Sequence, residues 1–192
     1  GLVMSEQLDI RGDIELLASR LCLLHARGGD YAQALVYAEQ AQAARDDHAL
    51  PLYLVSSQYE TETWLWAGKR AEAEQEIKRL ERRLGTNWRY RISLLRSRAV
   101  LARVDGNDEQ AIRDLKEAGH LAQTLGLPGE QWQTLAALGR LHQRGGEDEQ
   151  ARAAFAHAAT LIHELAGKIQ DKELRRSFVE APFVQEVLCL AE

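Results

Sequence analysis

The chain has few of the residues that favour β-strands or interrupt helices. Valine, isoleucine and threonine together number 21 of 192 residues, and only three residues are proline. Alanine and leucine, in contrast, contribute 28 and 29 residues. β-branched side chains lose rotamer freedom in a helix, whereas alanine and leucine enter it at little cost. The composition therefore favours long helices and argues against a β-sandwich, a Rossmann domain and a disulfide-stapled chain.

The chain also lacks features that would place it in a membrane, outside the cell or on nucleic acid. No stretch approaches the roughly 18–20 apolar residues needed to span a bilayer, and the segment 1–11 has no long apolar run typical of a signal peptide. The two cysteines, Cys22 and Cys189, each lie in an apolar run, which predicts two buried, reduced thiols. The net charge of −5 does not suit a general nucleic-acid binder. We predict a cytoplasmic protein without direct nucleic-acid or membrane contacts.

A short pattern recurs four times along the chain, with a glycine followed by polar residues and then by an alanine five positions after the glycine. The glycines are separated by 39, 38 and 40 residues, and the four pairs are Gly29 with Ala34, Gly68 with Ala73, Gly106 with Ala111, and Gly146 with Ala151. Glycine readily adopts the left-handed conformation that ends a helix. Each copy therefore predicts a tight turn between two helices, with capping-box-like spacing at Asp30 and Asn107.

The flanking residues predict the helices on either side of each turn. Residues nine and twelve positions after each glycine are apolar or small, and together with the alanine they share one helical face. The residue seven positions before each turn glycine is always small, which predicts that two helices approach each other closely there. The expected pairs are 13–27 with 31–46, 51–67 with 70–84, 88–104 with 108–125, and 129–145 with 148–169, followed by short helices at 172–180 and 183–191. Pro51, Pro128 and Pro182 fall at expected helix starts.

These residues resemble the tetratricopeptide repeat, a helix–turn–helix unit that stacks with its neighbours. The last repeat shows the resemblance best, through Trp132, Leu135, Leu138, Gly139, Gly146, Ala151, Phe155 and Ala158. The first repeat shows it through Leu21, Cys22, Gly29, Tyr31, Ala34 and Ala41. The middle repeats carry Glu60 and Arg98 where the family prefers leucine. The resemblance implies an all-α fold, a right-handed superhelix of about four helix pairs with repeats at 13–46, 51–84, 88–125 and 129–169. A C-terminal cap at 172–191 would complete a single domain over 1–192.

The period near 39 residues is longer than the usual 34 and is similar to the repeats of large bacterial signalling ATPases, including MalT-like transcription activators. This resemblance implies a non-enzymatic protein–protein interaction module that is a fragment of a larger bacterial signalling or transcription-regulatory protein. Two other functions stay open. The module could be a sensor that binds a small effector in its concave groove, or a structural oligomerisation module.

In this repeat family the first helix of each pair lines the concave surface, which gives a candidate partner-binding face. The residues expected there are Arg27, Gln58, Glu62, Trp66, Arg96, Arg103, Gln133, Arg140, Gln143 and Arg144. Five arginines against one carboxylate make a basic lining on an acidic protein. Because arginine binds carboxylates bidentately and stacks on aromatic rings, the expected partner is a protein or an acidic peptide segment. The alternative is a solvated polar face that binds nothing.

We find no motif for catalysis, a cofactor or a metal. There is no phosphate-binding glycine loop, and no zinc or nucleophile motif. Cys22 and His25 lie three residues apart at core-facing positions, and we interpret them as packing residues. His157, His163 and Glu164 are interpreted as a solvated helix face. We therefore expect no catalytic residue, no cofactor and no metal ligand.

The last segment concentrates apolar bulk in a short stretch. Its residues are Phe178, Val179, Phe183, Val184, Val187 and Leu188. A repeat stack ends in an exposed apolar face unless something covers it, so these residues predict a cap. The alternative is a docking surface for another chain, which would make the protein a homodimer through its C-terminal helices.

Overall fold

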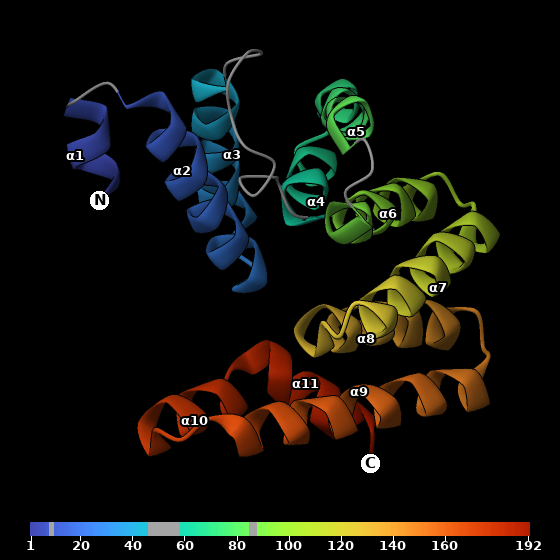
Figure 1. Cartoon of the computed structure of the whole chain (residues 1–192). Coiled ribbons are helices and arrows are strands. Elements are labelled where there is room, and N and C mark those ends of the chain that lie inside the picture. Colours follow the sequence, from blue (N-terminus) through green and yellow to red (C-terminus); the bar gives the residue numbers. More distant parts are fainter. Residues whose placement is uncertain (8–9, 46–57, 85–87) are drawn as a thin grey trace. The chain divides into compact units, whose positions relative to one another are not determined.

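The computed structural model describes residues 1–7, 10–45, 58–84 and 88–192, and in these ranges the chain forms helices and no strand (Figure 1). The described helices are α1 (Leu2–Gln7), α2 (Arg11–Arg27), α3 (Tyr31–Ala44), α4 (Gln58–Trp66), α5 (Arg70–Leu84), α6 (Trp88–Val104), α7 (Asp108–Thr124), α8 (Pro128–Arg144), α9 (Asp148–Lys168), α10 (Lys172–Val179) and α11 (Pro182–Leu190). The all-α fold class is confirmed. No helix in these ranges is both long and apolar enough to cross a bilayer.

Most helix ends lie within two residues of their predicted positions. The four turn glycines Gly29, Gly68, Gly106 and Gly146 all have φ between 70° and 79°, as a left-handed helix stop requires. The capping prediction is also confirmed. Asp30 accepts a hydrogen bond from the backbone N–H of Gln33 at 3.1 Å, and Asn107 does the same for Gln110 at 3.1 Å. Pro128 and Pro182 occupy the first turns of α8 and α11.

Two parts of the prediction differ from the structure or cannot be compared with it. Helix α1 was not predicted, because six residues are too few to show a helical period; it packs against α2 and buries Ser5. The expected start of the helix at Pro51 lies outside the described residues.

The chain divides into two compact units, Gly1–Asp105 and Gly106–Glu192, here called unit 1 and unit 2. The division falls between the two helices of the third predicted pair, α6 and α7. The superhelix and the single domain over 1–192 therefore remain predictions.

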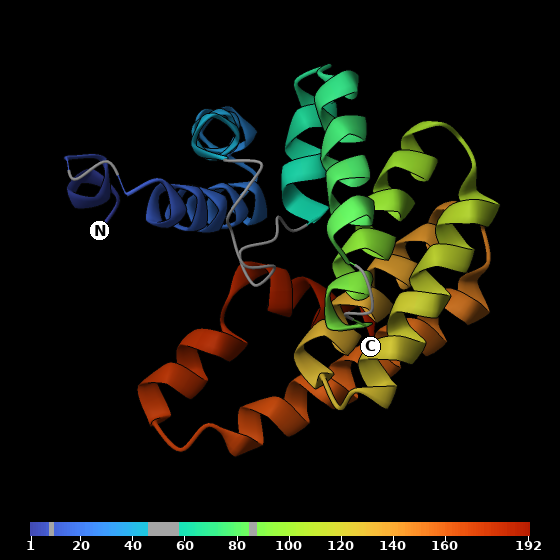
Figure 2. The same cartoon turned by 45° about the horizontal axis from the view of Figure 1, so that its top comes forward.

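Unit 1 is built from α1 to α6. Helix α2 packs along α3, and α4 contacts α2, α3, α5 and α6; Figure 2 shows α4 and α5 side by side. Small residues line the contacts, and Cys22, Ala34 and Ala38 are completely buried around Trp64, which is 1% exposed. The small side chains allow the helix axes to approach closely, as the repeated pattern predicted.

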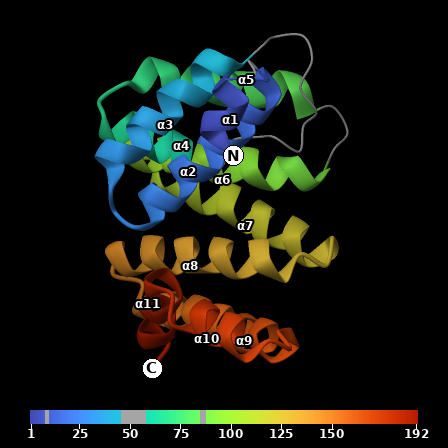
Figure 3. The ribbon, with the colours of Figure 1, turned by 90° about the vertical axis from the view of Figure 1, so that its left-hand side faces the viewer.

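Unit 2 is built from α7 to α11, with α8 packed between α7 and α9. A Cβ placed on Gly139 would lie 2.8 Å from the ring of Phe155, so α8 and α9 approach closely there and any larger residue would displace this ring. Helix α11 lies beside α9 (Figure 3) and buries Val184 and Val187 completely. The ring of Phe183 stacks on Trp132 with centroids 5.9 Å apart. The C-terminal segment thus packs against the apolar residues of α8 and α9, and its role as the cap of a repeat stack stays a prediction.

The two cysteines have different environments. Cys22 is completely buried, as predicted. Cys189 is exposed, so the prediction of a second buried thiol was wrong. The prediction rested on the apolar run around Cys189. Helix α11 is amphipathic, however, and it turns Val184 and Val187, rather than Cys189, toward the core.

Candidate partner-binding surface

The ten residues predicted to line a concave face are divided between the two units. In unit 1, Trp66 and Arg103 are exposed, Arg27 and Glu62 are partly buried, and Gln58 and Arg96 are buried with 9% and 4% exposure. In unit 2, Gln143 and Arg144 are exposed, whereas Gln133 and Arg140 are partly buried. Burial leaves Gln58 and Arg96 little area for a partner, and a binding role for the ten as one set remains a prediction.

Part of the predicted set gathers around an exposed tryptophan in unit 1. Trp66 ends α4 and is 56% exposed. Its indole stacks on the ring of Tyr31, the first residue of α3, with centroids 5.8 Å apart and ring planes 19° apart. A tryptophan that keeps more than half of its surface in water, yet has a fixed ring partner, is a suitable platform for binding.

Charged side chains lie near Tyr31 of this pair and near a second tyrosine, Tyr59. The guanidinium of Arg27 lies over the ring of Tyr59, 5.0 Å from its centroid. Burial raises the pKa of Tyr31 above its usual value, the charge of Glu62 raises it further, and the charge of Arg103 lowers it. Both charges therefore act on Tyr31. We call Arg27, Tyr31, Tyr59, Glu62, Trp66 and Arg103 the aromatic–arginine surface.

Sequence reasoning found four of these six residues and missed the two tyrosines. Tyr31 entered the sequence analysis only as part of the repeat resemblance, but its position at the start of α3 leaves it partly exposed beside Trp66. Tyr59 could have been found from its spacing, because Tyr59, Glu62 and Trp66 are three and four residues apart and lie on one face of a helix.

A second feature of unit 1 was not foreseen, a buried ion-pair cluster centred on Arg45. This side chain, only 8% exposed, contacts the carboxylates of Glu15 at 3.1 Å and Glu76 at 2.8 Å, and also that of Glu60. The carboxylates come from α2, α5 and α4, and each is at most 5% exposed. Arg79 contacts Glu76 at 2.7 Å and lies 3.6 Å from Glu15. One arginine at the end of α3 thus ties together three other helices.

The ion-pair cluster explains why residue 60 is glutamate rather than the leucine that the repeat family prefers. It also shifts the pKa values of its own members. Ser19 donates a hydrogen bond to Glu60, whose side chain is almost completely buried. Burial raises the pKa of Glu15 although Arg45 and Arg79 both oppose the shift, and Oε2 of Glu15 has no hydrogen-bond partner among the described residues. Burial opposes protonation of Arg45, but Glu60, Glu76 and Glu15 together hold its pKa above the ordinary value. So deeply buried a cluster serves packing rather than substrate binding.

The residues considered as possible metal ligands in the sequence do not come together in the structure. Cys22 lies 3.7 Å from the hydroxyl of Thr63, and His25 lies 3.3 Å from Asp30, so each has a local partner. Burial raises the pKa of the Cys22 thiol to about 12. His157, His163 and Glu164 are exposed on α9. Within the described ranges, no three side chains of the ligating types gather in a way that could hold a metal ion.

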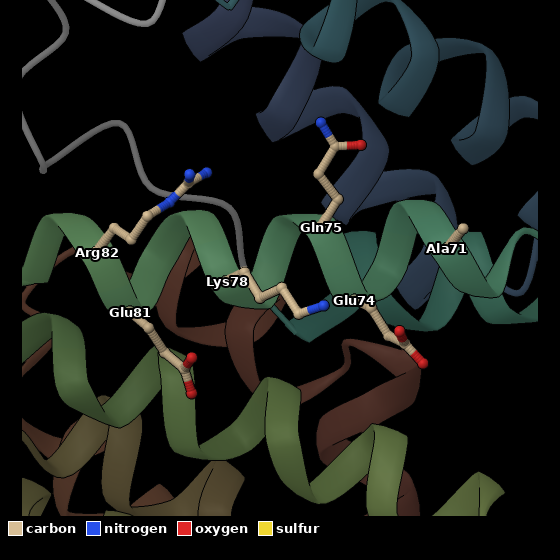
Figure 4. Close-up of a pocket in the computed structure, with 6 residues that line it drawn as sticks. All are labelled: Ala71, Glu74, Gln75, Lys78, Glu81 and Arg82. Atoms are coloured by element: carbon tan, nitrogen blue, oxygen red, sulfur yellow. The ribbon is translucent and has the colours of Figure 1, made fainter.

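An open hollow of about 620 Å³ lies along α5 in unit 1 (Figure 4). Its described lining comes from this helix alone and consists of Ala71, Glu74, Gln75, Lys78, Glu81 and Arg82. Charges of both signs alternate along it, and Glu81 already lies 3.7 Å from Arg98 of α6. A surface of mixed sign without apolar depth offers little selectivity, so we do not consider it a site.

Comparison with known proteins does not assign the chain to a family. No protein-family model matches the sequence, and no curated protein matches it either. The class that the structure defines is an all-helical protein, and this class is compatible with repeated helix–turn–helix units.

Proposed function

We propose that this chain is a non-enzymatic helical-repeat module of the tetratricopeptide type that binds a protein partner through the aromatic–arginine surface. The observation that carries the proposal is the exposed indole of Trp66, stacked on Tyr31 with Glu62 and Arg103 near it. The repeated glycine turns and their small-residue contacts support the repeat type, and a right-handed superhelix of the repeats is part of the proposal. The long period supports an origin in a larger bacterial regulator.

The chemistry of the surface favours a partner segment that carries a carboxylate next to an aromatic or apolar side chain. Trp66 offers a flat face for stacking, and Arg103, which is exposed, offers a fork of N–H donors for a carboxylate. The guanidinium of Arg27 lies over the ring of Tyr59, and this contact limits the conformational freedom of the Arg27 side chain before a partner binds. A side chain fixed in advance loses less entropy on binding.

The test is a selection of peptides from a displayed random library on the purified chain. We expect the selected peptides to be enriched in aspartate, glutamate and aromatic residues. Trp66→Ala and Arg103→Glu should each weaken the best peptide by about tenfold or more, as the loss of a central interface residue does. Arg20→Glu is the matched control, since Arg20 is also exposed in unit 1 but lies outside this surface.

Two outcomes would contradict the proposal. One is a set of selected peptides without acidic enrichment. The other is an unchanged affinity in both Trp66→Ala and Arg103→Glu while circular dichroism shows the helices intact. Arg140 is a poorer test residue than Arg103, because it pairs with Glu186 at 3.0 Å and its reversal would also disturb that contact.

A second candidate is a homodimer through the C-terminal helices. None of the residues of α10 is buried, and Leu174 on this helix is 65% exposed. Leu174→Glu should therefore convert a dimer to a monomer in sedimentation experiments without lowering the melting temperature. A parent chain that sediments as a monomer at high concentration would rule this candidate out.

A further inference from the structure

Unit 2 contains a groove of about 250 Å³ that the predicted concave residues do not line. On α7 it is bordered by residues spaced three and four apart, including Lys116, Gly119 and His120. On α8 its apolar floor includes Leu135 and Leu138. Helix α8 lies between α7 and α9 in unit 2 (Figure 3), and His157 of α9 completes the lining.

The groove and the predicted face occupy different sides of α8. Gln133 and Arg140 each follow a groove residue, Gln131 and Leu138, by two positions. Successive residues of an α-helix are turned by about 100°, so two positions turn the side chain to the opposite side. The groove is therefore a separate surface from the one expected on sequence grounds.

The ionisable side chains of the groove are all of basic type. They are Lys116, His120 and His157, and no carboxylate is among the described lining residues. None of the three makes a hydrogen bond or an ion pair with another residue in the described part of the chain. In a chain with a net charge of −5, three unpaired basic side chains around an apolar floor are complementary to an acidic ligand.

An amide in the groove favours a peptide over a simple anion. Gln131 is 8% exposed, lines the groove, and its side chain makes no hydrogen bond to any described residue. A glutamine amide offers one carbonyl acceptor and two N–H donors, the same groups that a peptide unit needs as partners. A peptide unit can both donate a hydrogen bond to this amide and accept one from it, whereas a simple anion can only accept.

The size of the groove limits what it can hold. Small-molecule sites usually measure about 300–1,000 Å³, and this groove is slightly smaller. At Gly119 a Cβ would lie 3.8 Å from Cγ2 of Thr134, an ordinary contact, so the absence of a larger side chain there keeps the groove open. The space suits one apolar side chain seated on Leu135 and Leu138.

We propose that this groove of unit 2 binds an extended peptide segment of a protein partner, in which one apolar side chain is flanked by acidic residues. The apolar side chain seats on Leu135 and Leu138, the peptide backbone pairs with the amide of Gln131, and the flanking carboxylates contact the basic side chains. This site is independent of the aromatic–arginine surface, which lies in unit 1.

The test uses a synthetic peptide with a central leucine between three acidic residues on each side, titrated into the ¹⁵N-labelled full chain. We expect shifts of the backbone amide signals of Gly119, His120 and Gln131 that saturate at micromolar to millimolar peptide. Gly119→Leu, which fills the groove, and His120→Glu should each weaken binding by about tenfold or more.

Matched variants keep the test decisive if Gly119→Leu folds poorly. Gly119→Ala should bind nearly as well as the parent, because a Cβ is accommodated at that position. Arg152→Glu reverses an exposed charge on α9 outside the groove and should leave the affinity unchanged.

Three results would overturn the proposal. The first is the absence of shifts at these amides with millimolar peptide. The second is equal binding of a peptide whose central leucine is replaced by serine, or of acetate alone, which would indicate a simple anion site. The third is a shift confined to Tyr31 and Trp66, which would assign the peptide to the aromatic–arginine surface and leave the groove without a ligand.

Discussion

The two units share one sequence pattern but have different interiors. Among the described residues, ten polar or charged side chains are buried in unit 1 and four in unit 2. Unit 1 encloses Arg45 and three carboxylates, whereas the matching interior of unit 2 is formed by Trp132, Phe155, Ile162 and other apolar residues. The glycine turns and small contact residues therefore determine how helices pair, but not whether charge or hydrocarbon fills the space between them.

The difference has a consequence for stability. Apolar burial contributes roughly 25 cal/mol per Å² without any partner, so the interior of unit 2 tolerates loss of single polar contacts. A buried charge is stable only while its partners remain, because an unpaired charge in the interior is strongly unfavourable. Unit 1 should thus depend on single residues of its cluster, whereas unit 2 should depend on close packing.

The largest expected difference is in thiol reactivity. Burial raises the pKa of Cys22 to about 12, and Cys189 is exposed. At neutral pH a shift of this size lowers the thiolate fraction about a thousandfold, and the thiolate is the reactive form. A thiol reagent such as DTNB should label Cys189 at once and Cys22 only as the chain unfolds. Cys189→Ser should abolish the fast phase, and two equally fast phases would contradict the burial of Cys22.

Breaking the buried cluster should have the largest effect on stability. Arg45→Met leaves Glu15, Glu60 and Glu76 without their shared cation, and we expect unfolding in urea to lose about 3–5 kcal/mol. Arg140→Met removes an ion pair of unit 2 whose partners are 41% and 52% exposed, and it should lose less than about 1 kcal/mol. Equal losses in the two variants would show that the interiors do not differ as described.

The close packing of unit 2 can be probed with one pair of glycines. Gly139→Ala would place its Cβ 2.8 Å from the ring of Phe155 and should lower the free energy of unfolding by about 1–3 kcal/mol. Gly119→Ala meets only an ordinary contact and should be neutral or stabilising by up to about 1 kcal/mol, because alanine favours a helix over glycine. Thermal melts of both variants measure the difference, and a stable Gly139→Ala would show that α8 and α9 are not so close.

The smallest expected effect concerns the pH dependence of unit 1. Burial raises the pKa of Glu15 above its ordinary value of 4.5, so the folded chain binds this proton more tightly than the unfolded chain does. The resulting stabilisation is present below the unfolded-state pKa and is lost as pH rises through the folded-state value. Glu15→Gln keeps a neutral side chain, so its stability relative to the parent should increase from pH 4.5 upward. Parallel stability curves of the two proteins would contradict the raised pKa.

The sequence predicted local features of the chain well and contacts between distant residues poorly, for physical reasons. Helix ends were predictable because they depend on residues close in sequence, such as the cap at Asp30 and the left-handed Gly29. The burial of Ala151 and Phe155 was predictable from their spacing on one face. The role of Glu60 was not predictable, because its partners Ser19 and Arg45 come from α2 and from the end of α3 and share no spacing with it.

The candidate binding surfaces show the same limit. Trp66 and Arg103 could be selected from their positions before the turn glycines, but Tyr31 joined them only through packing of α3 against α4. The groove of unit 2 has a spacing of three and four on both α7 and α8, yet nothing in the sequence shows that these two stripes face each other. His157 enters that groove from a third helix.

By itself the sequence determined the helical class, the turns and the small residues at the helix contacts, because these follow from backbone conformation and from side chains within one or two turns. The tertiary structure alone decided that Arg45 is buried among three carboxylates, that Cys189 is exposed, and that basic side chains surround an apolar groove in unit 2. Each of these depends on which helix faces which. Contacts between residues 30 or more positions apart, such as Glu15 and Arg45, arise only when helices pack.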